Sequence, residues 1–342
     1  MPPHPSGRVY AENGLGGTFA KLIPRKSTFA RAWTTENRQR STPPHAIMGG
    51  LFSRPFSTGK TATHPRPVVL ITGCSQGSTG YALAEEMARR GARVYASAVK
   101  AAEMEGLNAN DGIRTLELDV TSEESIQAAV THVVAEEGRV DVLVNNAGIG
   151  MPCPVADVRL HQLRQVLDVN LYGAVAMARA VFPVMAQQQT RSRILNMASV
   201  AAYVNRPWSC AYSASKAALA AATSCMRMEM RPFGIDVVLV TPGYIKSRIF
   251  CNALASAPVL PSSSLYKSYE ACYREQFAAS AYNPWATNTD DFAARLADVA
   301  LAKGSPPWRV LYGHQALLAV LMSYVPATLL DSLVWLAFAK RK

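Results

Sequence analysis

The stretch Val68-Val69-Leu70-Ile71-Thr72-Gly73-Cys74-Ser75-Gln76-Gly77-Ser78-Thr79-Gly80 decides the fold of this 342-residue chain. Residues 68–72 form a short apolar run that predicts a buried strand. The glycines that follow let a backbone approach a phosphate closely, and Tyr81–Arg90 then has the pattern of a helix. This order of strand, glycine-rich turn and helix predicts the first unit of a nucleotide-binding α/β domain.

Strand and helix patterns continue to alternate after this unit. Further strands are predicted at Arg93–Ala98, Thr115–Leu118, Val140–Val144, Ser192–Met197 and Ile235–Val240. Helices are predicted at Ser122–Glu137, Leu160–Gln187, Ala211–Arg231, Ser268–Ser280 and Asp290–Lys303. Such alternation is typical of βαβ units. We therefore predict one doubly wound, Rossmann-like α/β domain over residues 67–310, with a mostly parallel sheet and helices on both faces.

The N-terminal residues 1–66 carry most of the excess positive charge of the chain. They hold ten Lys and Arg residues against Glu12 and Glu36, among many Ser, Thr and Pro residues and without apolar periodicity. We predict that they are disordered. Three interpretations stay open: a mitochondrial transit peptide, a nonessential tail, or an upstream extension of a shorter product. Because the remaining residues are close to neutral, the charge does not indicate that the folded part binds nucleic acid.

The C-terminal residues 311–342 are strongly apolar but interrupted. His314, Gln315, Pro326 and Asp331 divide them into stretches shorter than the roughly 20 residues that a membrane-spanning helix needs. The segment ends in Lys340-Arg341-Lys342, which suits a helix lying in a membrane interface or on a lipid droplet. Packing as a terminal helix of the domain, or as a dimer contact, is the alternative.

The six cysteines show neither a Cys-x-x-Cys pair nor a spacing shared with histidines. We therefore predict no metal site and interpret the cysteines as free thiols of a reducing compartment. No secretory signal pattern opens the sequence, which agrees with an intracellular location.

The end of the second predicted strand bears on the choice of cofactor. It reads Ala96-Ser97-Ala98-Val99-Lys100 and lacks the Asp or Glu that would hydrogen-bond the ribose 2′-hydroxyl of NAD. Lys100 is a candidate partner for a 2′-phosphate, so we predict NADP(H) rather than NAD. The residues expected at the adenine are Asp119 and Val120, and those expected beside the ribose are Asn146, Ala147 and Gly148.

A group of four residues further along the chain has the pattern expected for catalysis at a carbonyl group. Tyr212 and Lys216 are four positions apart, so they share one face of a helix. A lysine ammonium lowers the pKa of a nearby tyrosine hydroxyl from its usual value of about 10. Tyr212 is therefore a candidate proton donor to a carbonyl oxygen. Ser199 is a candidate for holding that oxygen, and Asn170 for holding a water that continues the proton relay.

Together these residues resemble the short-chain dehydrogenase/reductase family, from about Arg66 to about Val310. The matching residues are Thr72-Gly73-x3-Gly77, Asp119, Asn145-Asn146-Ala147-Gly148, Asn170, Ser199, Tyr212-x3-Lys216 and Pro242-Gly243. The resemblance implies that Asn170, Ser199, Tyr212 and Lys216 form a catalytic tetrad. It further implies cofactor contacts by Thr72, Gly73, Ser75, Gly77, Gly80, Tyr212, Lys216, Pro242, Gly243, Ile245 and Ser247, of which Ile245 and Ser247 position the nicotinamide carboxamide.

The glycine turn is one residue longer than the family pattern, because Ser78 and Thr79 separate Gly77 from Gly80. The longer turn resembles the branch of 1-acyldihydroxyacetone-phosphate reductases, whose turn reads Thr-Gly-Cys-Ser-x-Gly-Gly-Ile-Gly. The family resemblance also implies a lid over the substrate at about residues 248–307. Its apolar lining is expected from Phe250, Leu254, Tyr266, Tyr269, Phe277 and Trp285.

We therefore expect an NADP(H)-dependent oxidoreductase that reduces a ketone on a hydrophobic, lipid-like substrate such as 1-acyldihydroxyacetone phosphate. The alternatives are a reductase or dehydrogenase of a secondary metabolite, steroid or retinoid, and a non-catalytic NADP-binding scaffold. We expect a homo-oligomer with peripheral contact to a membrane or lipid droplet through the C-terminus. The surface of the endoplasmic reticulum or of lipid droplets is the favoured location, with the cytoplasm and mitochondrion as the others.

Overall fold

The computed structural model describes residues 66–107, 112–188 and 190–339. The disorder predicted for the N-terminal residues therefore concerns residues outside the described part, apart from Arg66. The interpretation of Lys340-Arg341-Lys342 likewise lies outside the described residues.

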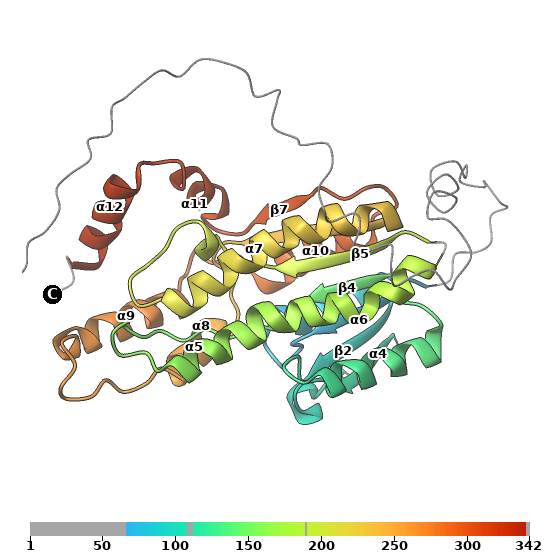
Figure 1. The fold of residues 1–342 in the computed structure, drawn as a ribbon, viewed down its shortest axis with the longest axis horizontal. Helices are drawn as coiled ribbons and strands as arrows, with labels where there is room; N and C mark the ends of the chain where they lie inside the picture. Colours follow the sequence, from blue (N-terminus) through green and yellow to red (C-terminus); the bar gives the residue numbers. More distant parts are fainter. Residues whose placement is uncertain (1–65, 108–111, 189, 340–342) are drawn as a thin grey trace, which may run out of the picture. The chain divides into compact units, whose positions relative to one another are not determined.

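Seven parallel strands form a single sheet in the order β3-β2-β1-β4-β5-β6-β7 (Figure 1). The strands are β1 (Val68–Thr72), β2 (Arg93–Ala98), β3 (Ile113–Glu117), β4 (Val142–Asn145), β5 (Ser192–Met197), β6 (Ile235–Pro242) and β7 (Arg309–Tyr312). Each neighbouring pair runs parallel. The predicted doubly wound α/β fold is confirmed, and the described sheet is wholly rather than mostly parallel.

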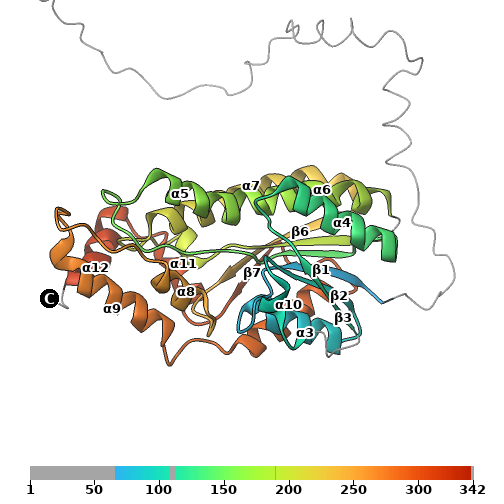
Figure 2. The same ribbon diagram turned by 90° about the horizontal axis from the view of Figure 1, so that it is seen from below.

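Helices cover both faces of this sheet (Figure 2). On one face lie α4 (Glu123–Glu137), α6 (Gly173–Gln187) and α7 (Cys210–Met230), and on the other lie α3 (Thr79–Arg89) and α10 (Thr289–Leu301). Strand β1 shows why its sequence is apolar at every position. Val68 and Leu70 contribute to one core cluster, while Val69 and Ile71 contribute to the other, because successive side chains point to opposite faces.

The strand order reverses beside β1, which pairs with β2 on one side and with β4 on the other. The turns after β1 and β4 therefore leave the sheet at the same edge, with Ile71 opposite Val144 in the register. In open α/β sheets this reversal creates the crevice in which ligands bind. The sequence places the glycine-rich turn on one side of that crevice and Asn146-Ala147-Gly148 on the other.

The long helix predicted over Leu160–Gln187 is present but contains a wider turn. Its segments are α5 (Leu160–Leu167), the π-helical η3 (Asp168–Tyr172) and α6. Among the described residues this is the single helix long and apolar enough to cross a membrane, yet α6 buries Met177, Ala178, Val181 and Met185 against the sheet. π-Helical turns are frequent at functional sites, and this one carries Asn170.

The boundary expected at residue 310 falls inside β7, so the sheet extends to Tyr312. Four residues, Arg309–Tyr312, are too few to give a periodic signal in the sequence, which is why this strand was not predicted. The helices α11 (Ala316–Met322) and α12 (Ala327–Ala339) follow. Ala316 and Val320 of α11 are buried. Among the described large apolar side chains of these two helices, those at least half exposed are Leu317, Leu318, Leu321, Leu329, Leu333 and Leu336.

The predicted lid region, about residues 248–307, contains α8 (Ile249–Ala255), the short η6 (Lys267–Tyr269), α9 (Glu270–Ala281) and α10. Helix α10 covers a face of the sheet, so the lid itself is formed by the segment that includes α8, η6 and α9. Its core consists of Trp208, Leu260, Tyr273 and Phe277 together with Cys153. Of the expected apolar lining, Phe250, Leu254, Tyr266 and Tyr269 pack against this cluster. Trp285 is 75% exposed, so it does not belong to the lining.

Candidate active site

The glycine turn after β1 forms a tight cradle. Gly73 has a φ of 73°, and a Cβ on it would lie 2.7 Å from the Cα of Ala147. A Cβ on Gly80 would lie 2.5 Å from both the Asn146 Nδ2 and the Gly73 carbonyl oxygen. Only glycine fits at these two positions, because any side chain would occupy the space between the turns.

The extra residue of the turn is absorbed by the start of α3. Ser78 is the N-cap, and its hydroxyl accepts a hydrogen bond from the Tyr81 amide and donates one to the Gly73 carbonyl, both at 3.1 Å. Thr79 is the first helical residue and donates to the Asn146 Oδ1 at 2.7 Å. The departure from the family pattern therefore adds hydrogen bonds that hold the turn together, and it does not disrupt the turn. The cradle and the N-terminus of α3 fit the pyrophosphate of a dinucleotide.

Thr72 and Asn146 join the two turns that flank the crevice. The Thr72 hydroxyl accepts from the amides of Asn146 and Ala147 at 3.1 and 3.0 Å. The Asn146 Nδ2 donates to the Thr72 and Gly73 carbonyls at 2.9 and 2.8 Å. Thr72 is 1% exposed and does not line the cavity, so its contribution is to hold the loops in place.

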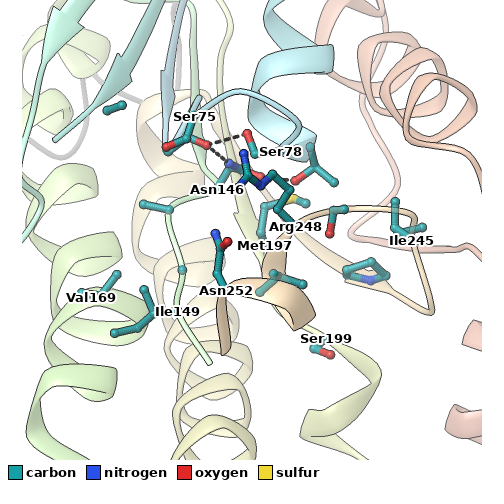
Figure 3. A pocket seen from close by; sticks show the side chains of 18 of the residues that line it. Ser75, Ser78, Asn146, Ile149, Val169, Met197, Ser199, Ile245, Arg248 and Asn252 are labelled. Atoms are coloured by element: carbon teal, nitrogen blue, oxygen red, sulfur yellow. Dashed lines mark hydrogen bonds between the residues drawn. The ribbon is translucent and has the colours of Figure 1, made fainter. Parts of the chain in front are cut away.

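A cavity of about 330 Å³ lies along this edge of the sheet. Of the predicted site residues it is lined by Gly73, Ser75, Asp119, Val120, Asn146, Ala147, Gly148, Ser199, Tyr212, Lys216, Pro242, Gly243, Ile245 and Ser247. The predicted residues outside its lining are Thr72, Gly77, Gly80, Lys100 and Asn170. In Figure 3 the labelled side chains run from Ser75 and Ser78 at one end to Ser199 at the other.

The charged residues of the cavity differ from those expected. Lys100 is exposed and lies outside the lining, whereas Glu103, in the 3-10 turn η1 (Ala101–Met104), lies within it. The Ser75 hydroxyl donates to the Glu103 carboxylate at 2.9 Å. Glu103 was not predicted from the sequence, because it follows the end of β2 by five residues. The turn of η1 places it beside the cavity.

Arg248 is a second residue that was not among those predicted to contact the cofactor. It directly precedes α8 and lines the cavity, and Figure 3 shows its side chain directed toward Ser78 and Asn146. Its Cδ would lie 2.9 Å from a Cβ on Gly77. The guanidinium therefore faces the glycine turn from the side of the lid, where it is placed to meet a phosphate.

Tyr212, Lys216 and Ser199 meet at the far end of the cavity. Tyr212 and Lys216 lie on α7, and the Lys216 Nζ lies 5.7 Å from the centroid of the Tyr212 ring. Lys216 is buried and donates to the Met197 carbonyl at 2.8 Å. Ser199 follows β5, is 8% exposed, and accepts from the Ala201 amide at 3.1 Å. The structure therefore brings these three predicted residues together in one cavity.

Burial dominates the protonation of the two helix residues. It raises the pKa of the Tyr212 hydroxyl, while the Ser199 side chain and the positive charge of Arg206 act in the opposite direction. Burial also lowers the pKa of Lys216 to about 8. A tyrosine that stays protonated at neutral pH can act as a proton donor.

Asn170 lies behind the cavity rather than in it. Its Oδ1 accepts from the Ile149 amide at 2.8 Å, and its Nδ2 donates to the Ile149 carbonyl and the Ser215 hydroxyl, each at 2.9 Å. A Cβ on Gly148 would lie 3.2 Å from the Lys216 Nζ and 3.3 Å from the Asn170 Oδ1. Asn170 thus stands close to Lys216 and fixes the strand end that forms the cavity floor.

A parallel sheet with a phosphate cradle at its reversal point, and a half-buried Tyr with a buried Ser and Lys in the same cavity, defines an oxidoreductase with a nicotinamide dinucleotide cofactor. The model of the short chain dehydrogenase family matches residues 67–256. The chain belongs to this family of oxidoreductases, which act on CH–OH and ketone groups.

Three relatives show the extent of the similarity. A short-chain dehydrogenase of Penicillium crustosum is 40% identical over 217 residues, which are 63% of this chain and 76% of that protein. The NADPH-dependent 1-acyldihydroxyacetone phosphate reductase of Schizosaccharomyces pombe is 35% identical over 206 residues, 59% of this chain and 68% of the relative. The crystal structure of a short-chain dehydrogenase from Streptomyces avermitilis has a TM-score of 0.66 at 27% identity, covering 79% of this chain and 94% of that one.

Proposed function

We propose that this oxidoreductase reduces a ketone on a hydrophobic, lipid-like substrate with NADPH, and that 1-acyldihydroxyacetone phosphate is such a substrate. The observation that carries the proposal is that Tyr212, Lys216 and Ser199 lie in one cavity beside an aromatic lid. The similarity to the NADPH-dependent 1-acyldihydroxyacetone phosphate reductase of Schizosaccharomyces pombe supports this substrate and this cofactor.

The residues of the chain divide the chemistry among them. A bound nicotinamide dinucleotide supplies the hydride that adds to the carbonyl carbon. The Tyr212 hydroxyl donates the proton to the carbonyl oxygen, and the Ser199 hydroxyl orients that oxygen by hydrogen bonding. The positive charges of Lys216 and Arg206 stabilise the tyrosinate that remains until it takes up a proton again.

A panel of ketones tests the proposal. Purified enzyme is offered 1-acyldihydroxyacetone phosphate, a steroid ketone, retinal and a secondary-metabolite ketone, each with NADPH and with NADH, and oxidation of the cofactor is followed by absorbance. We expect the highest kcat/KM for the acyl ester with NADPH. If another ketone has a higher kcat/KM, the acyl ester is not the preferred substrate. If no member of the panel is turned over, the proposal that the protein is a ketone reductase is contradicted.

The choice of cofactor depends on the balance between Arg248 and Glu103. Arg248 and the absence of an acid at Ala96–Lys100 favour a phosphate, whereas the Glu103 carboxylate opposes one by repulsion. We expect Glu103→Gln to tighten NADPH binding by about threefold to tenfold, because Glu103 is exposed and its charge is partly screened. NADH binding should change by less than about threefold.

Titration of nicotinamide fluorescence measures both dissociation constants. The matched control is Glu105→Gln, since Glu105 belongs to the same loop but does not line the cavity. If Glu103→Gln weakens NADH binding and leaves NADPH binding unchanged, the carboxylate instead accepts a hydrogen bond from the ribose, and NADH is the preferred cofactor.

Peripheral membrane contact and a location at the endoplasmic reticulum or on lipid droplets stay predictions. The exposed leucines of α11 and α12 support contact with a lipid surface. Because α12 has 13 residues, its length of roughly 20 Å is short of the bilayer core. Flotation with anionic phospholipid vesicles tests the contact, and a protein that stays at the bottom of the gradient would contradict it.

A further inference from the structure

A second, smaller hollow extends the active site toward the lid. It shares Tyr212, Ile249 and Phe250 with the cofactor cavity. Its remaining lining includes Met151, Arg206, Ser209 and Phe277. Because the proton donor Tyr212 belongs to both spaces, the hollow lies where the part of a substrate next to its carbonyl would reside.

Arg206 brings a positive charge into this hollow without a carboxylate partner. Its Nη1 donates to the Tyr244 hydroxyl at 3.2 Å and to the Ser280 hydroxyl at 3.1 Å. Its guanidinium carbon lies 5.8 Å from the ring centroid of Phe250 and 5.2 Å from that of Phe277. Within the described part of the chain, no ion pair involves Arg206.

The orientation of Arg206 leaves hydrogen-bond donors for a ligand. A guanidinium carries five N–H donors, and those on Nε and Nη2 have no acceptor among the described residues. Two hydroxyls and two rings hold the group in position but leave its charge uncompensated. A partly buried cation in such surroundings gains most from an anion that accepts two parallel hydrogen bonds.

Ser209 supplies an independent second signal. It is 4% exposed, lines the hollow, and its hydroxyl has no hydrogen-bond partner in the described structure. A buried hydroxyl without a partner is costly, so a ligand atom at this position would relieve the cost. Ser209 is also the N-cap residue of the 21-residue helix α7, where the helix dipole favours negative charge.

We propose that Arg206 and Ser209 bind an anionic oxygen group of the substrate, a phosphate or a carboxylate, next to the ketone that is reduced. This inference rests on the proposed ketone reduction. Ser209 precedes Tyr212 by three residues, a rise of about 4.5 Å along a helix. The anionic group is therefore a few bonds from the carbonyl, as in a phosphorylated hydroxyketone or a short keto acid, and not at the far end of a long chain.

Paired substrates that differ only in this charge test the proposal. One pair is 1-acyldihydroxyacetone phosphate and its dephosphorylated form, and the other is 3-oxobutanoate and its methyl ester. Because the charge of Arg206 also acts on the pKa of Tyr212, Arg206→Gln should lower kcat/KM for the neutral members too. We expect the loss for the anionic members to be about 10- to 100-fold larger than the loss for the neutral members. Ser209→Ala should have the same selectivity with a smaller loss, and Arg206→Lys should recover part of the loss.

The two pairs also identify the anionic group. If Arg206→Gln affects the charged member selectively in the first pair alone, the group is a phosphate, and if it does so in the second pair alone, the group is a carboxylate. The control is Arg274→Gln on α9, since Arg274 lies outside both cavities and should not change the ratio within either pair. Equal losses for charged and neutral members would overturn the proposal, since Arg206 would then act only through Tyr212 or the lid.

A binding measurement separates this inference from the proposed function. Glycerol 3-phosphate and acetate are titrated against the wild-type protein and Arg206→Gln, each saturated with cofactor, and the thermal midpoint is followed. We expect the wild type to be stabilised by at least one of the two anions and the variant by neither. If neither anion stabilises the wild type, the anion site is wrong even where neutral ketones are reduced. Stabilisation without turnover of any ketone would instead contradict the reductase.

Discussion

Replacing Tyr212 by phenylalanine is expected to lower kcat by about 10²- to 10⁴-fold, the usual contribution of a positioned general acid. The substitution removes only the hydroxyl, and the ring keeps its place beside Lys216. The cradle for the cofactor lies at the other end of the cavity, around Gly73 and Ser78. The dissociation constant for NADPH should therefore stay within about threefold, because the phosphate contacts of the cradle are unchanged.

Stopped-flow turnover and fluorescence titration of NADPH measure the two quantities separately. Tyr282→Phe is the matched control, since Tyr282 is 78% exposed at the end of α9 and should keep full activity. If kcat of the Tyr212 variant stayed within tenfold of the wild type, another group would have to deliver the proton. Loss of NADPH binding in that variant would show instead that the hydroxyl helps to build the cofactor site.

Replacing Lys216 by methionine is expected to abolish activity and to stabilise the protein at pH 7. Burial lowers the pKa of Lys216 from 10.5 to about 8, which means that the fold carries the cost of a buried ammonium. A shift of this size corresponds to at most about 3 kcal/mol of unfolding free energy. The variant also loses the hydrogen bond to the Met197 carbonyl, and this loss reduces the expected stabilisation by about 1 kcal/mol.

The pH dependence of this stabilisation has a definite sign. Below about pH 8 Lys216 is charged in both the folded and the unfolded state, so the wild type carries the full cost. Between pH 8 and 10.5 the unfolded chain binds the proton and the folded protein does not, so the stability of the wild type rises relative to the variant. The advantage of Lys216→Met should therefore shrink across this window.

Urea unfolding at pH 7 and pH 10 measures the difference in free energy. The control Lys303→Met removes an exposed lysine and should change stability little at either pH. A Lys216 variant that is less stable than the wild type at pH 7 would mean that the ammonium contributes more through its hydrogen bond than it costs by burial.

Local patterns in the sequence were sufficient for six of the seven described strands and for the pairing of Tyr212 with Lys216. The run Val68–Thr72 is apolar throughout because both faces of β1 are covered, so it could be recognised without its partners. Tyr212 and Lys216 could be paired from their spacing alone, since an α-helix places residues four apart on one side. Strand β7 could not be recognised from the sequence, because its four residues are too few to show a strand pattern and are identified only by their pairing with β6.

The charged residues that face the cavity could be identified only from the tertiary structure. Lys100 and Glu103 are three residues apart, and the sequence offered no reason to prefer the second, which the turn of η1 directs into the cavity. Arg248 directly precedes α8, and Arg206 contacts Ser280 and Phe277 of α9. Their approach to Gly77 and Tyr212 is therefore a property of the packed domain.

The sequence by itself determined the first six strands and the helices that alternate with them, the glycine cradle, and the spacing between Tyr212 and Lys216. These follow from interactions between residues close in the chain, whose geometry is set by backbone sterics and hydrogen bonding. The tertiary structure decided which cations and which carboxylate face the ligand. Such contacts join residues far apart in the chain, as with Arg206 and Ser280, and they exist only once the sheet and the lid have packed together.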